Sequence, residues 1–319
     1  MKRNGRSGVN NVLITGISGF LGLNLTERLL SKAGYNVYGI ADNLNPLARQ
    51  KLKEWTASGK LKFYKLDLLN LALLRRVISR LGLNYVAHLA GYVDSGTSYE
   101  IAKRCVDSNI KGTLNLLEAV KGLNIRRFVY SSTIEIYGNN FDLPSTYAVT
   151  KLTGEMLSRL YFRLYGIPVA ILRFANVYGP YQKKDKIIPM SILNSLESKD
   201  VYLKSRRGQG RDFCFVSDAA EAIIASFNNK KAIGQTFDIV SGRDYSIHKT
   251  AKMIVRKTNS KSRIILKPTK ARPLETRQVK RNYSKAKKIL GWRPGFNLEE
   301  GLDKTIAWYK SLKNKERVK

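Results

Sequence analysis

The chain has 319 residues with 43% hydrophobic and 10% aromatic content, values typical of a globular protein with a substantial core. No apolar run approaches the roughly 18 residues that span a membrane, and the apolar stretch 12–15 is too short for the core of a secretory signal. Neither Cys105 and Cys214 nor His88 and His248 have metal-ligand spacing. We therefore expect a cytoplasmic protein with reduced cysteines, no membrane association and no metal site.

The formal net charge of +33 is unusual for a protein of this size. The C-terminal residues 251–319 are especially basic, with 21 Lys and Arg against 5 Asp and Glu. Such a field attracts nucleic acid, anionic membranes or phosphorylated substrates. The cations are spread along the sequence and form no known nucleic-acid-reading module, which favours a solvated basic surface. The charge predicts anionic partners without naming one.

Short apolar runs alternate with amphipathic stretches over the first two-thirds of the chain. The predicted strands are residues 12–15, 36–41, 61–65, 85–89, 127–131 and 169–174. The predicted helices are residues 20–33, 45–58, 71–81, 97–121, 145–165 and 186–198. This alternation is typical of repeated β-α units, and near-continuous apolar strands belong to a sheet covered on both faces. We therefore predict an α/β fold with a Rossmann-type, doubly wound parallel sheet.

The pattern loosens beyond Pro180. A strand at 213–216 leads into a helix at 217–227, and another strand follows at 236–240. The remainder predicts mixed helix and short strand, ending in an amphipathic helix at 298–312. A smaller mixed α/β region is therefore expected after the sheet.

A glycine-rich loop follows the first predicted strand and opens directly into a helix. Gly16, Gly19 and Gly22 are spaced by three, as in loops where the backbone turns tightly and approaches a pyrophosphate. The helix N-terminus adds free N–H groups and a positive partial charge, which suit an anion. The loop therefore predicts a bound dinucleotide.

Two acidic residues follow the next two strands. Asp42 lies 42 − 16 = 26 positions after Gly16, where it can accept hydrogen bonds from the adenosine ribose and repel a 2′-phosphate. This favours NAD over NADP, although Arg49 nearby leaves NADP open. Asp67 is a candidate for binding the adenine amine, with a helix cap as the alternative.

Tyr147 and Lys151 are four residues apart on a predicted helix, so their side chains share a face. A nearby ammonium favours the phenolate and is expected to lower the phenol pKa from roughly 10 toward neutrality. A tyrosine tuned in this way can take a proton from an alcohol and later return it. The pair predicts one half of an alcohol oxidation, and the dinucleotide predicts the hydride acceptor.

Together these residues resemble the extended short-chain dehydrogenase/reductase family, the NAD-dependent nucleotide-sugar epimerases and dehydratases. The motifs that carry the resemblance are TGISGFLG at 15–22, HLAG at 88–91, NIKGTLNLLEA at 109–119, YSSTIEIYG at 130–138, YAVTK at 147–151, LRFANVYGP at 172–180, GRDFCFVSDAAEAI at 210–223 and SKAKKILGWRP at 284–294. They occur in the family's order over nearly the whole chain. We accordingly predict a NAD-binding domain at 10–177 joined by 212–240, a nucleotide-sugar-binding region at 178–211 and 241–312, and basic tails at 1–9 and 313–319.

The resemblance implies roles for individual residues. Thr133 hydrogen-bonds the reacting sugar hydroxyl, Tyr147 is the base, and Lys151 also binds the nicotinamide ribose. Asn109 matches a position near the active-site backbone. Besides the three glycines, the two aspartates, Tyr147 and Lys151, the implied NAD contacts are Ser18, Phe20, Leu21, Leu68, Leu89, Ala90 and Gly91. The implied nucleotide-sugar contacts, besides Thr133, are Asn176, Arg211 and Arg272, the two arginines clamping the diphosphate.

Assembly is implied by the same resemblance. Relatives commonly pair through the two long helices beside the active site, which correspond to residues 97–121 and 145–165. A homodimer is therefore expected.

The family shares an oxidation, usually at C4 of the sugar, and then diverges into epimerases, 4,6-dehydratases and decarboxylases. Dehydratases of the family resemble Thr-(Asp or Ser)-Glu at positions 133–135, with the glutamate as C5 base. The chain keeps Glu135 but has Ile134, which cannot donate a proton to a leaving hydroxyl. We therefore favour a 4-epimerase of the UDP-glucose 4-epimerase kind. The alternatives are a dTDP-glucose or GDP-mannose type 4,6-dehydratase and a UDP-glucuronate decarboxylase using Glu135.

Two departures from the family pattern affect the site. Only 147 − 133 = 14 positions separate Thr133 from Tyr147, so the intervening loop is short and we expect a more open pocket. Leu274 stands where the family commonly has glycine, which weakens the assignment of Arg272.

Two rival functions remain at this point. A nucleic-acid-binding protein on this fold, as among some plant relatives, would suit the charge but would gain nothing from Tyr147, Lys151 and the glycine loop. A reductase or redox sensor that releases NADH would show net NADH during turnover, whereas epimerases and dehydratases recycle bound NAD.

Overall fold

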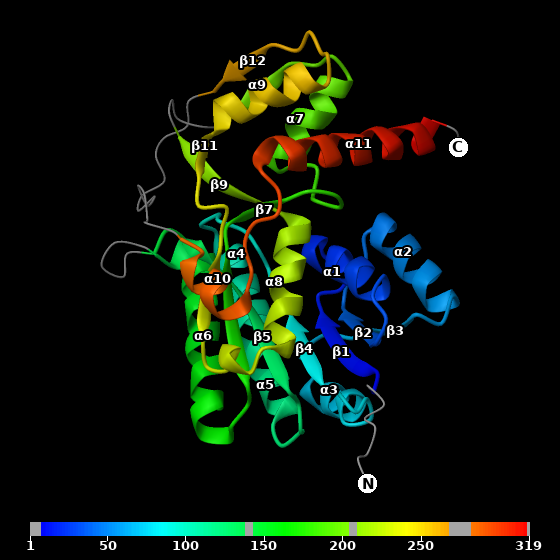
Figure 1. Ribbon diagram of the computed structural model, residues 1–319, viewed down its shortest axis with the longest axis vertical. Helices are drawn as coiled ribbons and strands as arrows, with labels where there is room; N and C mark the ends of the chain where they lie inside the picture. The colour runs from blue at the N-terminus through cyan, green and yellow to red at the C-terminus, as the bar shows by residue number, and fades with distance from the viewer. Residues whose placement is uncertain (1–7, 138–142, 204–208, 268–281, 318–319) are drawn as a thin grey trace.

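The computed structural model describes residues 8–137, 143–203, 209–267 and 282–317. A seven-stranded parallel sheet forms the centre of the larger lobe, in the order β10-β6-β5-β4-β1-β2-β3 (Figure 1). Its strands are β1 (Asn10–Thr15), β2 (Tyr35–Ala41), β3 (Leu61–Lys65), β4 (Tyr85–His88), β5 (Arg127–Thr133), β6 (Val169–Phe174) and β10 (Thr236–Ile239). The order 3-2-1-4-5-6 is that of the doubly wound dinucleotide-binding fold, so the predicted fold class is confirmed.

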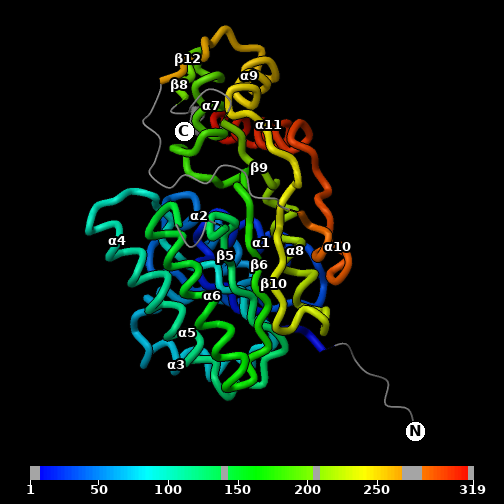
Figure 2. The backbone as a smooth tube through the Cα atoms, turned by 90° about the vertical axis from the view of Figure 1, so that its left-hand side faces the viewer, coloured from blue at the N-terminus to red at the C-terminus, as the bar shows by residue number. Residues whose placement is uncertain are grey.

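Helices cover both faces of this sheet, giving three layers (Figure 2). One face carries α1 (Phe20–Leu30), α2 (Pro46–Ala57), α8 (Val216–Asn228) and α10 (Ser284–Leu290); the other carries α3 (Leu71–Ile78), α4 (Tyr99–Cys105), α5 (Gly112–Val120) and α6 (Thr146–Tyr165). Successive residues of β1 serve the two cores in turn. Val12 and Ile14 are buried with α1 and α8, and Leu13 is buried with α3 and α5. This alternation explains why a doubly covered strand is apolar at every position.

The predicted helix 97–121 is helical over most of its length but contains a π-helical turn. Residues Val106–Lys111 form this turn between α4 and α5. Single π-turns inside α-helices are frequent at functional sites because they re-aim a side chain. Here the turn contains Asn109, which is 1% exposed.

In its described part, the smaller lobe is built from short strands and helices that lie above the sheet (Figure 1). Its strands are β7 (Asn176–Tyr178), β8 (Val201–Leu203), β9 (Gly210–Phe215), β11 (Asp244–Ser246) and β12 (Ile264–Leu266), and its helices are α7 (Ile187–Leu196), α9 (Ile247–Lys257) and α11 (Leu298–Arg317). Four of the strands have three residues and were not predicted, because so short a segment carries no periodicity.

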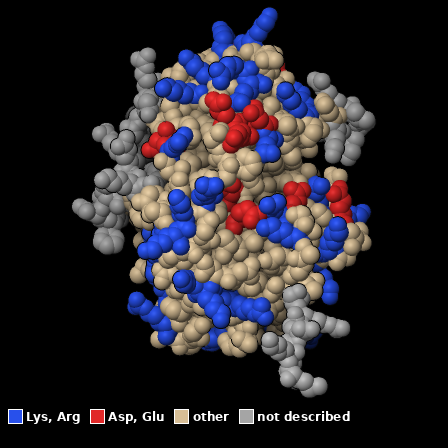
Figure 3. All heavy atoms as spheres, viewed as in Figure 1, with Lys and Arg blue, Asp and Glu red and all other residues tan. Residues whose placement is uncertain are grey.

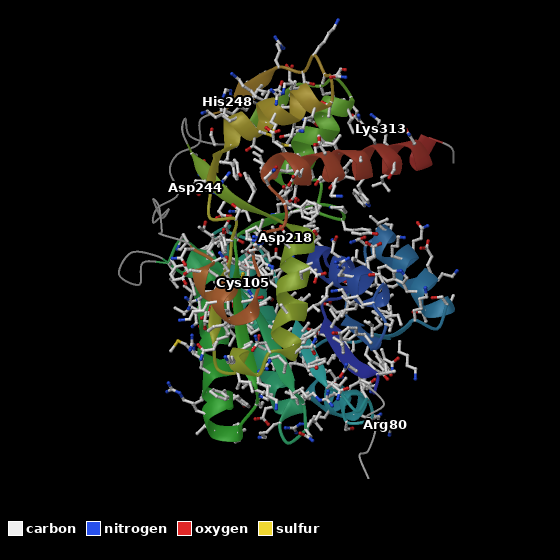
Figure 4. The ribbon with its side chains drawn as sticks, in the orientation of Figure 1. Arg80, Cys105, Asp218, Asp244, His248 and Lys313 are labelled. Atoms are coloured by element: carbon white, nitrogen blue, oxygen red, sulfur yellow. The ribbon has the colours of Figure 1, made fainter. Side chains whose placement is uncertain are left out.

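Helix α11 extends further than the sequence predicted. It continues to Arg317, so residues 313–317, assigned above to a basic tail, are helical. Lys313, labelled in Figure 4, donates to the carbonyl of Leu196 at 3.2 Å and lies 3.6 Å from the Glu197 carboxylate. These contacts with the end of α7 explain why a strongly basic segment remains helical.

Asp218, at the start of α8, connects the two lobes (Figure 4). Its carboxylate accepts a hydrogen bond from the backbone N–H of Phe296 at 3.2 Å, and its carbonyl accepts one from the Trp292 indole at 2.9 Å. Burial raises the pKa of Asp218 to about 6. Segment 292–296 therefore ties α11 of the smaller lobe to the sheet.

Lys and Arg side chains are distributed over both lobes on the face drawn in Figure 3, with fewer acidic side chains among them. No helix within the described residues is long and apolar enough to cross a membrane. Across the same residues, no group of three or more His, Cys, Asp and Glu is placed to hold a metal ion.

Gly154 allows α6 to approach the sheet closely. A Cβ at this position would lie 2.0 Å from the Tyr130 hydroxyl oxygen of β5. Gly154→Ala is therefore expected to lower the free energy of unfolding by about 1–3 kcal/mol, as overpacking does. Chemical denaturation measures this change.

The matched control is Gly112→Ala at the start of α5. A Cβ there would meet its nearest atom, Leu68 Cβ, at an ordinary 3.5 Å. This variant should be neutral or more stable by up to roughly 1 kcal/mol, because alanine is the better helix former. Equal losses in both variants would contradict the close contact at Gly154.

Candidate functional site

The glycine loop after β1 makes a backbone cradle. Gly16 has a φ of +70°, and a Cβ on it would lie 2.7 Å from the Cα and N of Ala90. A Cβ on Gly22 would lie 2.4 Å from the Gly16 carbonyl oxygen. Gly19 is the N-cap of α1, and no side chain caps the first N–H groups of this helix. The loop therefore offers free backbone donors at a positive helix end, which fits the pyrophosphate of a dinucleotide.

The acidic residues predicted to bind the adenosine follow neighbouring strands. Asp42 comes directly after β2 and is exposed. Asp67 follows β3 and accepts a hydrogen bond from the N–H of Leu69 at 2.9 Å. The cap of α3 is Asn70, whose side chain accepts from the N–H of Leu73. Asp67 is thus not the helix cap offered above as its alternative role.

The other predicted cofactor contacts lie around these two loops. Ser18 donates to the Asn43 carbonyl at 2.8 Å, which links the glycine loop to the end of β2. Phe20 and Leu21 open α1, Leu68 is buried beside Asp67, and the loop after β4 contains Leu89, Ala90 and Gly91. The structure brings these residues to the carboxyl ends of the strands.

A buried hydrogen-bond chain fixes the loop after β4. His88 lies between the hydroxyls of Thr15, at 2.7 Å, and Thr113, at 2.8 Å. Burial lowers the pKa of His88 to about 3, so the imidazole is neutral. The Asn109 amide donates to the Tyr92 carbonyl at 3.0 Å and accepts from its N–H at 2.8 Å. The π-turn thereby positions the chain segment that passes beside the site.

Thr133, Tyr147 and Lys151 come together at the ends of β5 and the start of α6. Thr133 is the last residue of β5; its hydroxyl accepts a hydrogen bond from the Glu135 N–H at 3.2 Å and lies close enough to Tyr147 to lower the pKa of the phenol. Lys151 is 4% exposed, and its Nζ lies 4.4 Å from the centre of the Tyr130 ring. The short interval between Thr133 and Tyr147 therefore does not separate them. The open pocket expected from it concerns a loop whose residues 138–142 lie outside the described residues.

The expected lowering of the Tyr147 pKa by Lys151 is wrong for this arrangement. Burial and the nearby Glu135 carboxylate raise the pKa of Tyr147, and the nearby Thr133 hydroxyl offsets this only in part. Burial also lowers the pKa of Lys151 to about 7, opposed by the negative charge of Glu155. A lysine that is partly neutral near pH 7 cannot by itself stabilise a phenolate.

Positions 134 and 135 point in opposite directions. Ile134 is 6% exposed and belongs to the hydrophobic core, whereas Glu135 is exposed. The Glu135 carboxylate is close enough to Tyr147 to raise the pKa of the phenol. Glu135 is therefore the acid or base nearest to the Thr133–Tyr147 pair on this turn.

The predicted phosphate ligands lie on the smaller lobe. Asn176 begins β7 and donates to the Asp212 carbonyl at 3.2 Å. Arg211, on β9, is partly exposed and donates to the Gly210 carbonyl at 3.0 Å. Arg272 lies outside the described residues. The structure thus places two of the three residues on adjacent strands above the carboxyl edge of the sheet.

The geometry agrees with what the chain resembles. Residues 13–305 match the GDP-mannose 4,6 dehydratase family. The chain belongs to this family of extended short-chain dehydrogenases/reductases, the NAD-dependent nucleotide-sugar epimerases and dehydratases.

Individual relatives match nearly the whole length of the chain, and a solved structure among them has the same fold. A UDP-glucuronate 4-epimerase of Thermodesulfobacterium geofontis is 35% identical, with 96% of this chain and 98% of the relative covered. Dehydratases also match, among them dTDP-glucose 4,6-dehydratase 1 of Escherichia coli, 28% identical over 94% of this chain and 92% of the relative. A crystal structure of UDP-glucuronic acid 4-epimerase from Bacillus cereus, in complex with UDP-glucuronic acid and NAD, superimposes with a TM-score of 0.85 at 30% identity, covering 95% of this chain and 99% of that one.

Several residues of the site were missed from the sequence. Tyr130 lies under Lys151, and Glu155 forms a buried ion pair with Arg173 of β6. Two signals were present: a carboxylate four residues after the lysine, and an arginine inside the apolar strand VAILRF. A charged residue in a doubly covered strand requires a partner, because an unpaired buried charge is costly.

Gly19→Ala tests whether a ligand approaches this backbone. The φ of Gly19 is −78°, which alanine readily adopts, and an added Cβ would lie 3.1 Å from the Gly16 carbonyl oxygen, so the loop has to shift by only a few tenths of an ångström. The methyl group would enter the space that a pyrophosphate needs. We expect NAD affinity by calorimetry to fall roughly tenfold or more, about 1.4 kcal/mol. Unchanged affinity at an unchanged melting temperature without ligand would contradict this site.

Proposed function

We propose that the chain is an NAD-dependent nucleotide-sugar 4-epimerase that oxidises and re-reduces C4 of a nucleoside-diphosphate hexose, in the manner of UDP-glucose 4-epimerase. The observation that carries the proposal is the convergence of Thr133 at the end of β5 with the buried Tyr147 and, one helical turn further, Lys151, beside the uncapped glycine loop. The similarity to two UDP-glucuronate 4-epimerases supports it.

Each residue has a role in this reaction. Thr133 holds the sugar hydroxyl against Tyr147, which takes its proton and returns it when the ketone is reduced. Lys151 donates hydrogen bonds to the nicotinamide ribose, and Asp42 accepts them from the adenosine ribose. NAD, when bound, supplies the hydride acceptor and donor. Because the hydride returns, no NADH is released, unlike in a reductase.

The nucleoside diphosphate is assigned to the smaller lobe. Arg211 and Asn176 supply donors there, and Arg272 stays a prediction. A guanidinium suits a diphosphate because it can donate two parallel hydrogen bonds. The division into a NAD-binding domain and a sugar-binding region, and the cytoplasmic location, stay predictions.

Glu135 supports a second candidate, a 4,6-dehydratase or a decarboxylase. Its carboxylate lies near Tyr147 and could take a C5 proton. Position 134 argues against a dehydratase, because the Ile134 side chain lies in the core and donates no proton to a leaving hydroxyl.

A panel of nucleotide sugars distinguishes these reactions by product mass. An epimerase leaves the mass unchanged, a dehydratase removes water and a decarboxylase removes carbon dioxide.

Tyr147→Phe should retain NAD binding and lose about 10²-fold or more in turnover, since proton transfer is removed. Near-normal turnover of this variant would show that Tyr147 is not the base.

We further propose a homodimer formed through α4 and α6. Among the residues that the structure describes, seven of the twelve exposed large hydrophobic residues lie on α4, the π-turn and α6: Tyr99, Val106, Val149, Met156, Leu160, Leu164 and Tyr165. The two helices pack against each other, so these side chains form one apolar surface. A second copy of the chain is the occupant that matches a continuous pair of exposed helices.

Leu160→Glu should convert the dimer to monomer, because a carboxylate would be buried at the interface without a partner. Light scattering at several protein concentrations measures the mass. Ile233→Glu, at an apolar residue of the larger lobe that is similarly exposed, is the control and should leave the mass unchanged. A wild-type protein that is monomeric at all concentrations would refute the dimer.

A further inference from the structure

Lys151 is a charged residue in an unfavourable environment. It is 4% exposed, its Nζ faces the Tyr130 ring, and a Cβ on Gly91 would lie 3.9 Å from it. Within the described residues, Nζ has no hydrogen bond or salt bridge. The ring attracts a cation, but this attraction does not replace lost hydration. Something else must favour the ammonium if Lys151 is to remain charged.

Glu155 supplies a buried carboxylate one turn further along the same face of α6. Glu155 is 1% exposed. Its two carboxylate oxygens accept hydrogen bonds from Arg173, Oε1 from Nε at 2.9 Å and Oε2 from Nη2 at 2.7 Å. This pairing keeps the carboxylate ionised and gives it one fixed position. Its negative charge counteracts the effect of burial on the pKa of Lys151.

Arg173 is itself held by two further elements. Its Nη1 donates to the Tyr137 hydroxyl at 2.7 Å, and that hydroxyl donates to Asp238 Oδ1 at 2.7 Å. Tyr137 follows β5 and Asp238 lies on β10. Burial raises the pKa of Tyr137 to about 12, so the phenol stays neutral. Asp238 also lies near the Lys285 ammonium, which favours its ionised form. Glu155 is therefore the carboxylate of this network whose charge acts on Lys151.

We propose that Glu155 is a positioning residue that keeps the catalytic-site lysine, Lys151, in its charged form, with Arg173, Tyr137 and Asp238 fixing the carboxylate. This rests on the proposed function only in taking Lys151 as a catalytic group. The alternative is a purely structural role, in which the Glu155–Arg173 ion pair attaches α6 to β6 and has no effect on Lys151. Other titratable groups around Lys151 do not replace Glu155: His88 is neutral, and burial raises the pKa values of Tyr130 and Tyr147.

The direction of the effect follows from the charges. Lys151 is protonated below its pKa of about 7 and neutral above it. Removing the Glu155 charge removes a stabiliser of the ammonium, so Lys151 loses its proton at a lower pH. Any step that needs the ammonium then fails at a lower pH. A nearby opposite charge typically shifts a titration by about one pH unit or more, and we expect a change of this size.

The titration can be observed without substrate or cofactor. With lysines labelled with ¹³C at Cε, only a lysine of pKa near 7 moves between pH 6 and 8, since ordinary lysines titrate near roughly 10.4. Loss of that signal in Lys151→Met assigns it. In Glu155→Gln we expect the midpoint to fall by about one pH unit. An unchanged midpoint overturns the proposal.

Glu155→Gln leaves Arg173 unpaired and could unfold the protein, so a second variant is needed. Glu155→Met with Arg173→Met removes both charges, and apolar replacement of a buried ion pair is often tolerated. The midpoint should fall in this variant too. Asp238→Asn is the control, because it disturbs the network at its far end and leaves the Glu155 carboxylate in place. An equal shift in this control would show a structural effect, not a charge effect, and would overturn the proposal.

Turnover gives an independent readout once the substrate is identified. The alkaline side of the kcat profile should move to lower pH in Glu155→Gln and stay in place in Asp238→Asn. A failure to find any nucleotide-sugar substrate would refute the proposed function but would leave the lysine titration as a separate result.

Discussion

The burial of one ammonium group, that of Lys151, constrains most of the surrounding structure. A lysine at this depth must face a ring or a carboxylate, since the cost of removing its charge from water is large. Tyr130 lies below it, and Gly154 allows the helix to approach that ring. The Tyr130 hydroxyl in turn lies 3.3 Å from the Lys151 carbonyl. The same residues that join α6 to β5 therefore also determine the environment of the lysine.

The parallel sheet explains why these groups meet the glycine loop. All seven strands run in one direction, so every loop after a strand emerges at the same edge. Gly16 follows β1, Asp42 follows β2 and Thr133 ends β5. The chain adds strands outward from β1 toward β3 on one side and from β4 toward β6 on the other. Ligands bind in such folds at this switch point between β1 and β4. His88 pairs across this junction with Thr15, and its neutral ring adds no charge there.

The sequence predicted the parallel sheet because its strands are apolar at nearly every position and alternate with helical periodicity. It also predicted which residues gather at the carboxyl edge, since several of the motifs directly follow a predicted strand. It could not predict the π-turn around Asn109, because a helix with one extra residue has nearly the same periodicity as one without. Three-residue strands such as β8 and β12 were missed because their pairing depends on partners about 60 residues away. The Glu155–Arg173 pair could not be predicted, because its residues lie on α6 and β6 and the sequence does not show how these two elements pack together.

The pKa values change how the tyrosine–lysine pair must act. A phenol whose pKa is raised by burial and by Glu135 is a poor base in the protein alone. A positive charge is needed near it at the moment of proton transfer, and a half-neutral Lys151 supplies this only in part. The Glu155 carboxylate increases the fraction of Lys151 that is charged, because it favours the ammonium form. It does so without forming an ion pair that would occupy the lysine Nζ. Arg173 prevents Glu155 from serving as a closer partner, because it already takes both carboxylate oxygens. The lysine thereby keeps its hydrogen-bond donors for a ligand while its charge is still compensated, and this separation of charge from hydrogen bonding makes a buried lysine usable beside the tyrosine that we propose as the base.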